Sequence, residues 1–108
     1  MRRSQILSVL NSGSTLVNFP FRVHFRKGEG ELAVSVPKRN FKRAVKRNLI
    51  RRRIREAYRL QLASRPGAEK YDMLIIYLSK EIEEYKVIES NVAAILEKIC
   101  GMAADKAD

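Results

Sequence analysis

Residues 38–59 carry the entire excess of positive charge in this sequence. The chain of 108 residues contains 22 Lys and Arg against 12 Asp and Glu, and this segment holds 11 of the basic residues with a single acid, Glu56. The rest of the chain is therefore balanced, with 11 residues of each sign. A charge excess confined to one short segment is the electrostatic signature of a protein that binds a polyanion.

The basic segment also has the pattern of an amphipathic helix. Between Ala44 and Leu62 it contains neither Pro nor Gly and is rich in residues that favour helices. We expect a helix from about Lys42 to Leu62, before the break at residues 64–67. Helical spacing separates an apolar stripe from a face that is mostly cationic. The apolar stripe consists of Ile50, Ile54, Ala57 and Tyr58, and the cationic face consists of Asn48, Arg51, Arg52, Arg55 and Arg59.

Two interpretations of the cationic face compete. A run of charges on a surface helix is often no more than a solvated face. Here, however, arginines four residues apart repel one another without neighbouring acids to relieve them. Arginine also outnumbers lysine, as bidentate binding of phosphate favours. We therefore predict a helix that packs on a core by one side and offers guanidinium groups to nucleic acid from the other.

Length and composition limit the class of protein. A chain of 108 residues with 45% hydrophobic residues is expected to form a single domain, residues 1–108, around one core. Its one cysteine, Cys100, has no partner for an internal disulfide, which favours a reducing compartment. Neither a signal peptide nor a membrane span is expected. The prediction is a cytoplasmic protein with no membrane partner.

The first third of the chain predicts a helix and a hairpin. Residues 3–12 have the pattern of a short amphipathic helix that ends at Gly13. Residues 16–27 are rich in strand formers, and their alternation is clear from Phe21 onward. We expect the strand that ends at Lys27 to form a hairpin with residues 31–36. Alternation directs Phe21, Val23 and Phe25 to one face of this hairpin and Arg22, His24 and Arg26 to the other.

The last third of the chain predicts a strand and a helix. Residues 73–78 form a continuous apolar run, which is typical of a strand covered on both faces. Apolar residues at helical spacing between Ile88 and Ile99 indicate an amphipathic helix that ends at Gly101. The order helix, two or three strands, helix, strand, helix indicates an α+β sandwich with a mixed sheet.

No motif for catalysis by the protein itself is present. The single His24 and the single Cys100 give neither a zinc site nor a pair of nucleophile and base. No glycine-rich motif for phosphate or dinucleotide binding occurs. The acids Glu81, Glu83 and Glu84 are expected at the start of a helix, where they complement its dipole. We therefore assign no catalytic residue and no metal ligand to the protein.

The spacing of the basic segment resembles the signature of the bacterial ribonuclease P protein component. The matching residues are Lys38, Ala44-Val45, Arg47-Asn48, Arg51-Arg52 and Arg55-Glu56, which include the core of what is called the RNR motif. The element order agrees as well, so the resemblance covers nearly the whole chain, while its specific part is the central motif.

This resemblance implies both a fold and a function. The fold would be a two-layer α/β sandwich of order α-β-β-β-α-β-α, with a mixed four-stranded sheet and a left-handed crossover through the basic helix. The function would be that of the protein subunit of ribonuclease P. That subunit binds the catalytic RNA, which removes the 5′ leader of precursor tRNA. The cofactor would be Mg²⁺, bound mainly through the RNA. No small-molecule substrate is expected. The implied RNA-binding residues are Lys38, Lys42, Arg43, Lys46, Arg47, Asn48, Arg51, Arg52, Arg55 and Arg59.

The resemblance also implies a cleft for the single-stranded leader, between the basic helix, the first helix and the open face of the sheet. Cationic and flat side chains would line it, since they suit phosphate attraction and base stacking. The implied cleft residues are Ile6, Leu10, Arg22, His24 and Arg26.

The sequence departs from the family pattern at three places. Lys42-Arg43 stand where Gly-Asn is usual, Arg51 replaces a lysine, and Ile6 and Leu10 occupy positions where phenylalanine is usual. Two alternatives stay open: a structural RNA-binding module similar to a ribosomal protein, and a DNA-binding helix. The second fits less well because a hairpin, rather than a short helix, is expected before the basic helix.

Overall fold

The structure of this protein, a computed structural model, describes residues 3–65 and 67–107. Its elements follow the predicted order α-β-β-β-α-β-α, with one short 3₁₀ turn, η1, added before the last strand. The elements are α1 (Arg3–Ser12), β1 (Ser14–Asn18), β2 (Phe21–Lys27), β3 (Leu32–Ser35), α2 (Ala44–Leu62), η1 (Ala68–Lys70), β4 (Tyr71–Tyr77) and α3 (Tyr85–Ala107).

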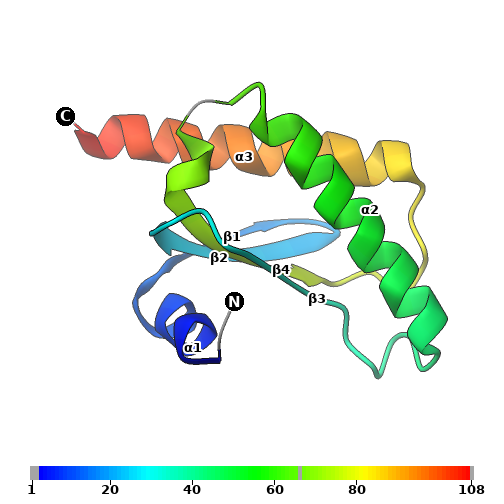
Figure 1. Ribbon diagram of the computed structural model, residues 1–108. Coiled ribbons are helices and arrows are strands. Elements are labelled where there is room, and N and C mark those ends of the chain that lie inside the picture. Colours follow the sequence, from blue (N-terminus) through cyan, green and yellow to red (C-terminus); the bar gives the residue numbers. More distant parts are fainter. Residues whose placement is uncertain (1–2, 66, 108) are drawn as a thin grey trace.

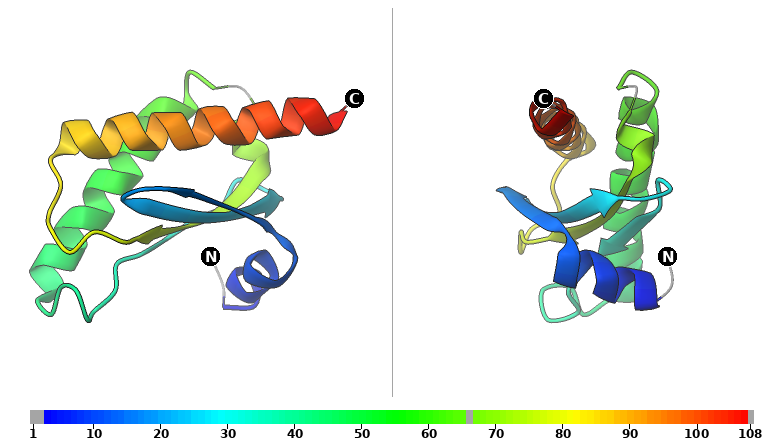
Figure 2. Two further views of the ribbon diagram at one scale, coloured as in Figure 1. Left: turned by 180° about the vertical axis from the view of Figure 1, so that it is seen from behind. Right: turned by 90° about the vertical axis from the view of Figure 1, so that its left-hand side faces the viewer.

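The four strands form one mixed sheet in the order β1-β2-β4-β3 (Figure 1). β2 runs antiparallel to both β1 and β4, whereas β3 and β4 are parallel and are connected through α2. The helices α2 and α3 cover one face of the sheet, and α1 lies against the other face (Figure 2). The predicted mixed sheet and the crossover through the basic helix are confirmed.

The predicted hairpin of residues 21–27 with residues 31–36 is wrong. The hairpin partner of β2 is β1, and β4 lies between β2 and β3. The continuous apolar run of β4 explains this order, because only a central strand buries both of its faces. Met73, Leu74 and Ile75 in β4 are all buried, whereas every residue of the edge strand β3 stays half-exposed.

A tight loop carries the chain from β2 across the start of β4 to the far edge. The buried carboxylate of Asp72 accepts hydrogen bonds from the amides of Glu29 and Glu31, each 3.0 Å long. Gly28 lies so close that a Cβ atom there would approach Oδ2 of Asp72 to 2.0 Å. Gly30 has a φ of 85°, in the left-handed region that favours glycine. The two glycines and the buried acid thus fix this crossing.

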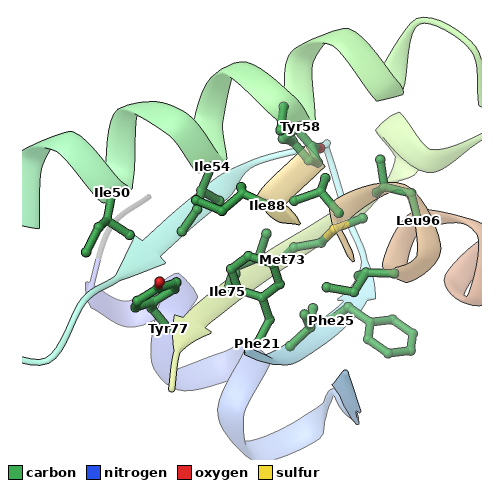
Figure 3. Packing of buried hydrophobic residues seen from close by; sticks show 14 of the residues in the cluster. Phe21, Phe25, Ile50, Ile54, Tyr58, Met73, Ile75, Tyr77, Ile88 and Leu96 are labelled. Carbon is green, nitrogen blue, oxygen red and sulfur yellow. The ribbon is translucent and has the colours of Figure 1, made fainter. Parts of the chain in front are cut away.

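The core lies between the sheet and the two covering helices (Figure 3). The residues of β2 predicted to face inward, Phe21, Val23 and Phe25, are buried there. The apolar stripe of α2 is confirmed, since its four members are the buried residues of that helix. Full burial of an isoleucine contributes about 1.5–3 kcal/mol, so the stripe holds α2 firmly on the sheet and leaves its opposite side in solvent.

Two predicted helix boundaries are wrong. α2 begins at Ala44 rather than Lys42, because residues 37–41 form a turn in which the amide of Phe41 donates to the carbonyl of Pro37. α3 does not end at Gly101 but continues to Ala107. A glycine inside a helix costs only about 1 kcal/mol relative to alanine, and the following residues, Met-Ala-Ala-Asp-Lys-Ala, largely favour helix.

Candidate nucleic-acid interface

The cationic face of α2 forms a shallow groove on the outside of the molecule. Asn48, Arg51, Arg52, Arg55 and Arg59 line it together with Glu56, and its volume is about 550 Å³. The structure therefore brings together the five residues that helical spacing predicted on one face. They lie on the side of α2 away from the buried stripe, and the groove extends from Asn48 to Arg59.

The charges of this face are not neutralised within the part of the chain that the structure describes. Arg51 donates to the side-chain oxygen of Asn48 at 3.3 Å, and no ion pair links the other arginines of the face to a described carboxylate. Glu56 is the one acid among the lining residues. Because repulsion between these arginines is left uncompensated, the face favours a polyanionic partner.

Two arginines of the same helix have a different role. Arg47 donates through Nη1 to the carbonyls of Phe41 and Lys42, at 2.8 and 2.9 Å, and so holds the chain where it enters α2. Arg53 donates to the carbonyl of Glu83 at 2.8 Å and ties α2 to the loop before α3. Arg47 was expected to face RNA, and part of its guanidinium is used inside the protein instead.

A second basic groove, which we call the N-terminal groove, lies at the beginning of α2. It has a volume of about 540 Å³ and is lined by Asn40, Phe41, Lys42, Arg43, Lys46, Lys80, Glu81 and Ile82. Three residues of the predicted RNA-binding set, Lys42, Arg43 and Lys46, therefore belong to this groove rather than to the cationic face. Lys38 is exposed in the loop that leads to them.

Lys80 is a residue of the N-terminal groove that the sequence did not indicate. It is brought there because β4 ends beside the start of α2, and the loop after β4 is held in place by the buried Tyr77. The hydroxyl of Tyr77 donates to the carbonyl of Glu81 at 2.6 Å and accepts from the amide of Glu83 at 3.0 Å. Burial raises the pKa of Tyr77, so this hydroxyl stays protonated.

The three acids of this loop lie at the approach to α3, and Glu84 directly precedes its first residue, Tyr85. Glu81, Glu83 and Glu84 precede α3, whose first turn contains no acidic residue. The backbone carbonyl of Glu84 accepts hydrogen bonds from the amides of Val87 and Ile88. Within the described residues no cluster of three or more His, Cys, Asp or Glu is arranged to hold a metal ion.

The face of the sheet against α1, which we call the open sheet face, carries polar and apolar side chains in rows. Residues paired across neighbouring strands project from the same face. The pairing therefore gives one row of Thr15, His24, Leu74 and Ala33, and a second row of Val17, Arg22, Ile76 and Ser35. The predicted placement of Arg22 and His24 on the face away from the core is consistent with this pairing.

The residues expected to form the leader cleft differ in their exposure. On α1, Ile6 is half-buried and Leu10 is 41% exposed. Arg22 is exposed on the sheet. Arg26 instead donates to the hydroxyl of Ser8, and its Nε is buried, so its guanidinium ties α1 to the sheet.

His24 lies in the middle of the open sheet face with one nitrogen already engaged. Its Nδ1 is 3.0 Å from Oγ1 of Thr15 on the neighbouring strand. Burial of the ring, reinforced by the positive charge of Arg22, lowers the pKa of His24 below 6.5. The lowered pKa favours the uncharged imidazole at neutral pH.

Fold and grooves together define a small α/β protein of the nucleic-acid-binding class, with its cations on the outside of one helix. None of the helices in the described residues is long and apolar enough to cross a membrane.

Comparison with known proteins gives the family. Residues 1–100 match the family model of Ribonuclease P. The "Ribonuclease P protein component" of Porphyromonas gingivalis is 33% identical over 110 residues, an alignment that covers 92% of this chain and 80% of the relative. The chain therefore belongs to the ribonuclease P protein family. Membership makes it a protein component of an endoribonuclease of tRNA processing, and thus an RNA-binding protein.

Solved structures confirm the fold. The ribonuclease P protein of Thermotoga maritima superposes with a TM-score of 0.78 at 24% identity, over 91% of this chain and 94% of the other. The Staphylococcus aureus ribonuclease P protein gives a TM-score of 0.76 at 20% identity, over 92% of both chains. The α/β sandwich is thus shared despite low sequence identity.

Proposed function

We propose that this protein binds the catalytic RNA of ribonuclease P through the cationic face of α2, and assists that RNA in removing the 5′ leader from precursor tRNA. The observation that carries the proposal is the row of uncompensated arginines on a helix whose other side is fixed in the core. A surface of this kind binds phosphates and leaves the chemistry to another component.

The cationic face suits the backbone of a folded RNA. Each phosphate neutralised adds about 0.7–0.9 to the salt slope of binding. With the four arginines of the face engaged, affinity is expected to fall on the order of 10²-fold between 50 and 200 mM salt. The N-terminal groove extends the same positive surface around the beginning of α2.

The open sheet face suits a single strand such as the leader. Arg22 offers a cation for phosphate, and the flat ring of His24 lies beside it with apolar Leu74 on the neighbouring strand. Proteins that bind single strands combine phosphate attraction with stacking of this kind. α1 closes one end of the face through Ser8 and Arg26, and beyond it Arg22 is exposed and His24 is half-buried.

In the proposed reaction, Mg²⁺ is held mainly by the RNA, whose phosphate oxygens are ligands that this ion prefers. The protein contributes binding and charge neutralisation: the arginines of α2 offset repulsion between RNA phosphates, and the open sheet face retains the leader. These contributions lower the concentration of Mg²⁺ that the assembled enzyme requires.

Reconstitution tests the proposal. The protein is combined with a bacterial catalytic RNA, and cleavage of precursor tRNA is measured at low Mg²⁺ with and without the protein. We expect cleavage to depend on both components, and precursor tRNA to bind the complex more tightly than mature tRNA. Failure of the protein to stimulate any bacterial catalytic RNA, together with tight binding to ribosomal RNA, would overturn the proposal and favour a ribosomal module.

A further inference from the structure

The hydrogen bond between Thr15 and His24 fixes one nitrogen of the imidazole and leaves the other free. The two residues are directly opposite in the β1–β2 hairpin, and Oγ1 of Thr15 lies 3.0 Å from Nδ1 of His24. Nε2 has no hydrogen-bond partner among the described residues, and it is not one of the buried polar atoms. The imidazole of His24, on the open sheet face, therefore has one unused polar atom, Nε2.

A neutral imidazole has one donor and one acceptor nitrogen, and the hydrogen bond made by one nitrogen sets the role of the other. The threonine hydroxyl can donate to an unprotonated Nδ1, which puts the proton on Nε2. An alkyl imidazole in water also prefers this tautomer. The Thr15 contact therefore adds to an intrinsic preference.

We propose that Thr15 is a positioning residue, whose hydroxyl donates to Nδ1 of His24 and thereby makes Nε2–H a fixed donor to an acceptor atom on a base of the single strand bound to the open sheet face. The proposal rests on the proposed function of the open sheet face as the leader site. It assigns to His24 a role in distinguishing bases, where stacking alone accepts any of them.

The surroundings of His24 favour a neutral donor over a cation. Leu74, which is 6% exposed, flanks the ring on the side away from Thr15. Arg22 and Arg26 lie two residues before and two residues after His24 on β2, and they project from the same face of the sheet as His24. Asp72 of β4 pairs with Arg26 and not with His24. The lowered pKa of His24 agrees with this environment. Phosphate attraction thus falls to Arg22, and base selection to His24.

Nuclear magnetic resonance tests the tautomer directly. His24 is the only histidine of the chain, so its ring nitrogens are assigned without ambiguity. We expect the folded protein to carry the proton on Nε2. In Thr15→Val, which keeps the branched shape and strand preference but removes the hydroxyl, the share of this tautomer should fall, and Thr15→Ser should restore it. An unchanged tautomer in Thr15→Val overturns the proposal.

Binding supplies the second measurement. The protein assembled with catalytic RNA is titrated with precursor tRNAs that differ at single leader bases, and with mature tRNA. We expect Thr15→Val to reduce the spread of affinities among the leaders by roughly 3- to 10-fold, the range of one neutral hydrogen bond, and Thr15→Ser to recover it. Thermal unfolding of each variant reports whether its fold is intact.

The measurements distinguish failure of the leader site from failure of the role of Thr15. If the wild-type complex binds precursor and mature tRNA equally, the proposed function of the open sheet face is wrong. If the wild-type complex prefers the precursor and Thr15→Val discriminates among leader bases as the wild type does, the leader site stands and the role of Thr15 is wrong.

Discussion

The cationic face of α2 and the open sheet face hold their polar side chains in different ways. Arg52 and Arg55 on α2 make no hydrogen bond or ion pair to other described residues, whereas Arg26 is held by Ser8 and His24 by Thr15. Long unrestrained guanidiniums adapt to a phosphate backbone, and restrained groups select between partners. Under the proposed function, we expect affinity for RNA to reside on the helix and discrimination between bases on the sheet.

The largest effect is expected from the buried side of α2, because the cationic face depends on it. Ile54 is fully buried, so Ile54→Ala should lower the free energy of unfolding by about 2–5 kcal/mol. Thermal unfolding measures the change. Val45 on the same helix is 79% exposed, and Val45→Ala should change stability by less than about 0.5 kcal/mol. Equal losses in the two variants would contradict the assigned faces.

The double variant Arg52→Ala/Arg55→Ala tests the cationic face itself. Loss of two phosphate contacts should reduce the salt slope of RNA binding by about 1.4–1.8 and weaken binding on the order of tenfold or more. Titrations with the catalytic RNA at several salt concentrations measure both quantities. Thermal stability should not fall, since these side chains have no partner among the described residues.

Arg53→Ala is the matched control on the same helix. Arg53 donates to the carbonyl of Glu83, so its loss should lower stability by about 1 kcal/mol and leave the salt slope nearly unchanged. If Arg53→Ala reduces the slope as much as the double variant does, the division of α2 into a cationic face and a packing side is wrong.

A pair of variants on the sheet sharpens the comparison. Arg26→Ala removes the hydrogen bond to Ser8 and should cost about 1–3 kcal/mol of stability. Arg22→Ala removes an exposed cation, which should leave stability within about 0.5 kcal/mol and weaken binding of precursor tRNA more than that of mature tRNA. Unfolding and binding measurements on both variants should separate the two arginines.

The smallest effect concerns the titration of His24. Its pKa is expected below 6.5, first because the ring is partly buried and second because Arg22 is near. The unfolded state then binds the proton more readily, so stability should rise with pH up to about 6.5 and be constant above it. Arg22→Gln should raise the pKa towards 6.5 without reaching it. A wild-type midpoint above 6.5 by nuclear magnetic resonance would contradict the environment described for the ring.

Local patterns predicted the helix faces well because helical periodicity is contained within a few turns. The stripe from Ile50 to Tyr58 needed no knowledge of the remaining chain. The failed hairpin had a different cause: β2 pairs with β4, whose residues lie some fifty positions later, and alternation does not identify a distant partner. Alternation therefore favours pairing with the next strand along the chain over pairing with β4.

The site shows the same limit. Lys80 lies 34 residues after Lys46 in the sequence, and only the return of β4 beside the start of α2 brings the two into one groove. Alternation indicated the face on which Arg26 and His24 project, but their contacts with Ser8 and Thr15 depend on the packing of α1 and on the register of β1. A pattern within one strand cannot contain either contact.

The position of β4 has a consequence for synthesis of the chain. β4 is the last of the described strands to leave the ribosome, and it is an inner strand of the sheet. The edges of β2 and β3 that pair with β4 therefore stay unpaired until about residue 77 has emerged. Exposed strand edges promote association between chains, and pairings between distant segments form slowly. The 43 residues before α2 therefore cannot complete a sheet alone, and nascent chains stalled before β4 are the species most prone to aggregate.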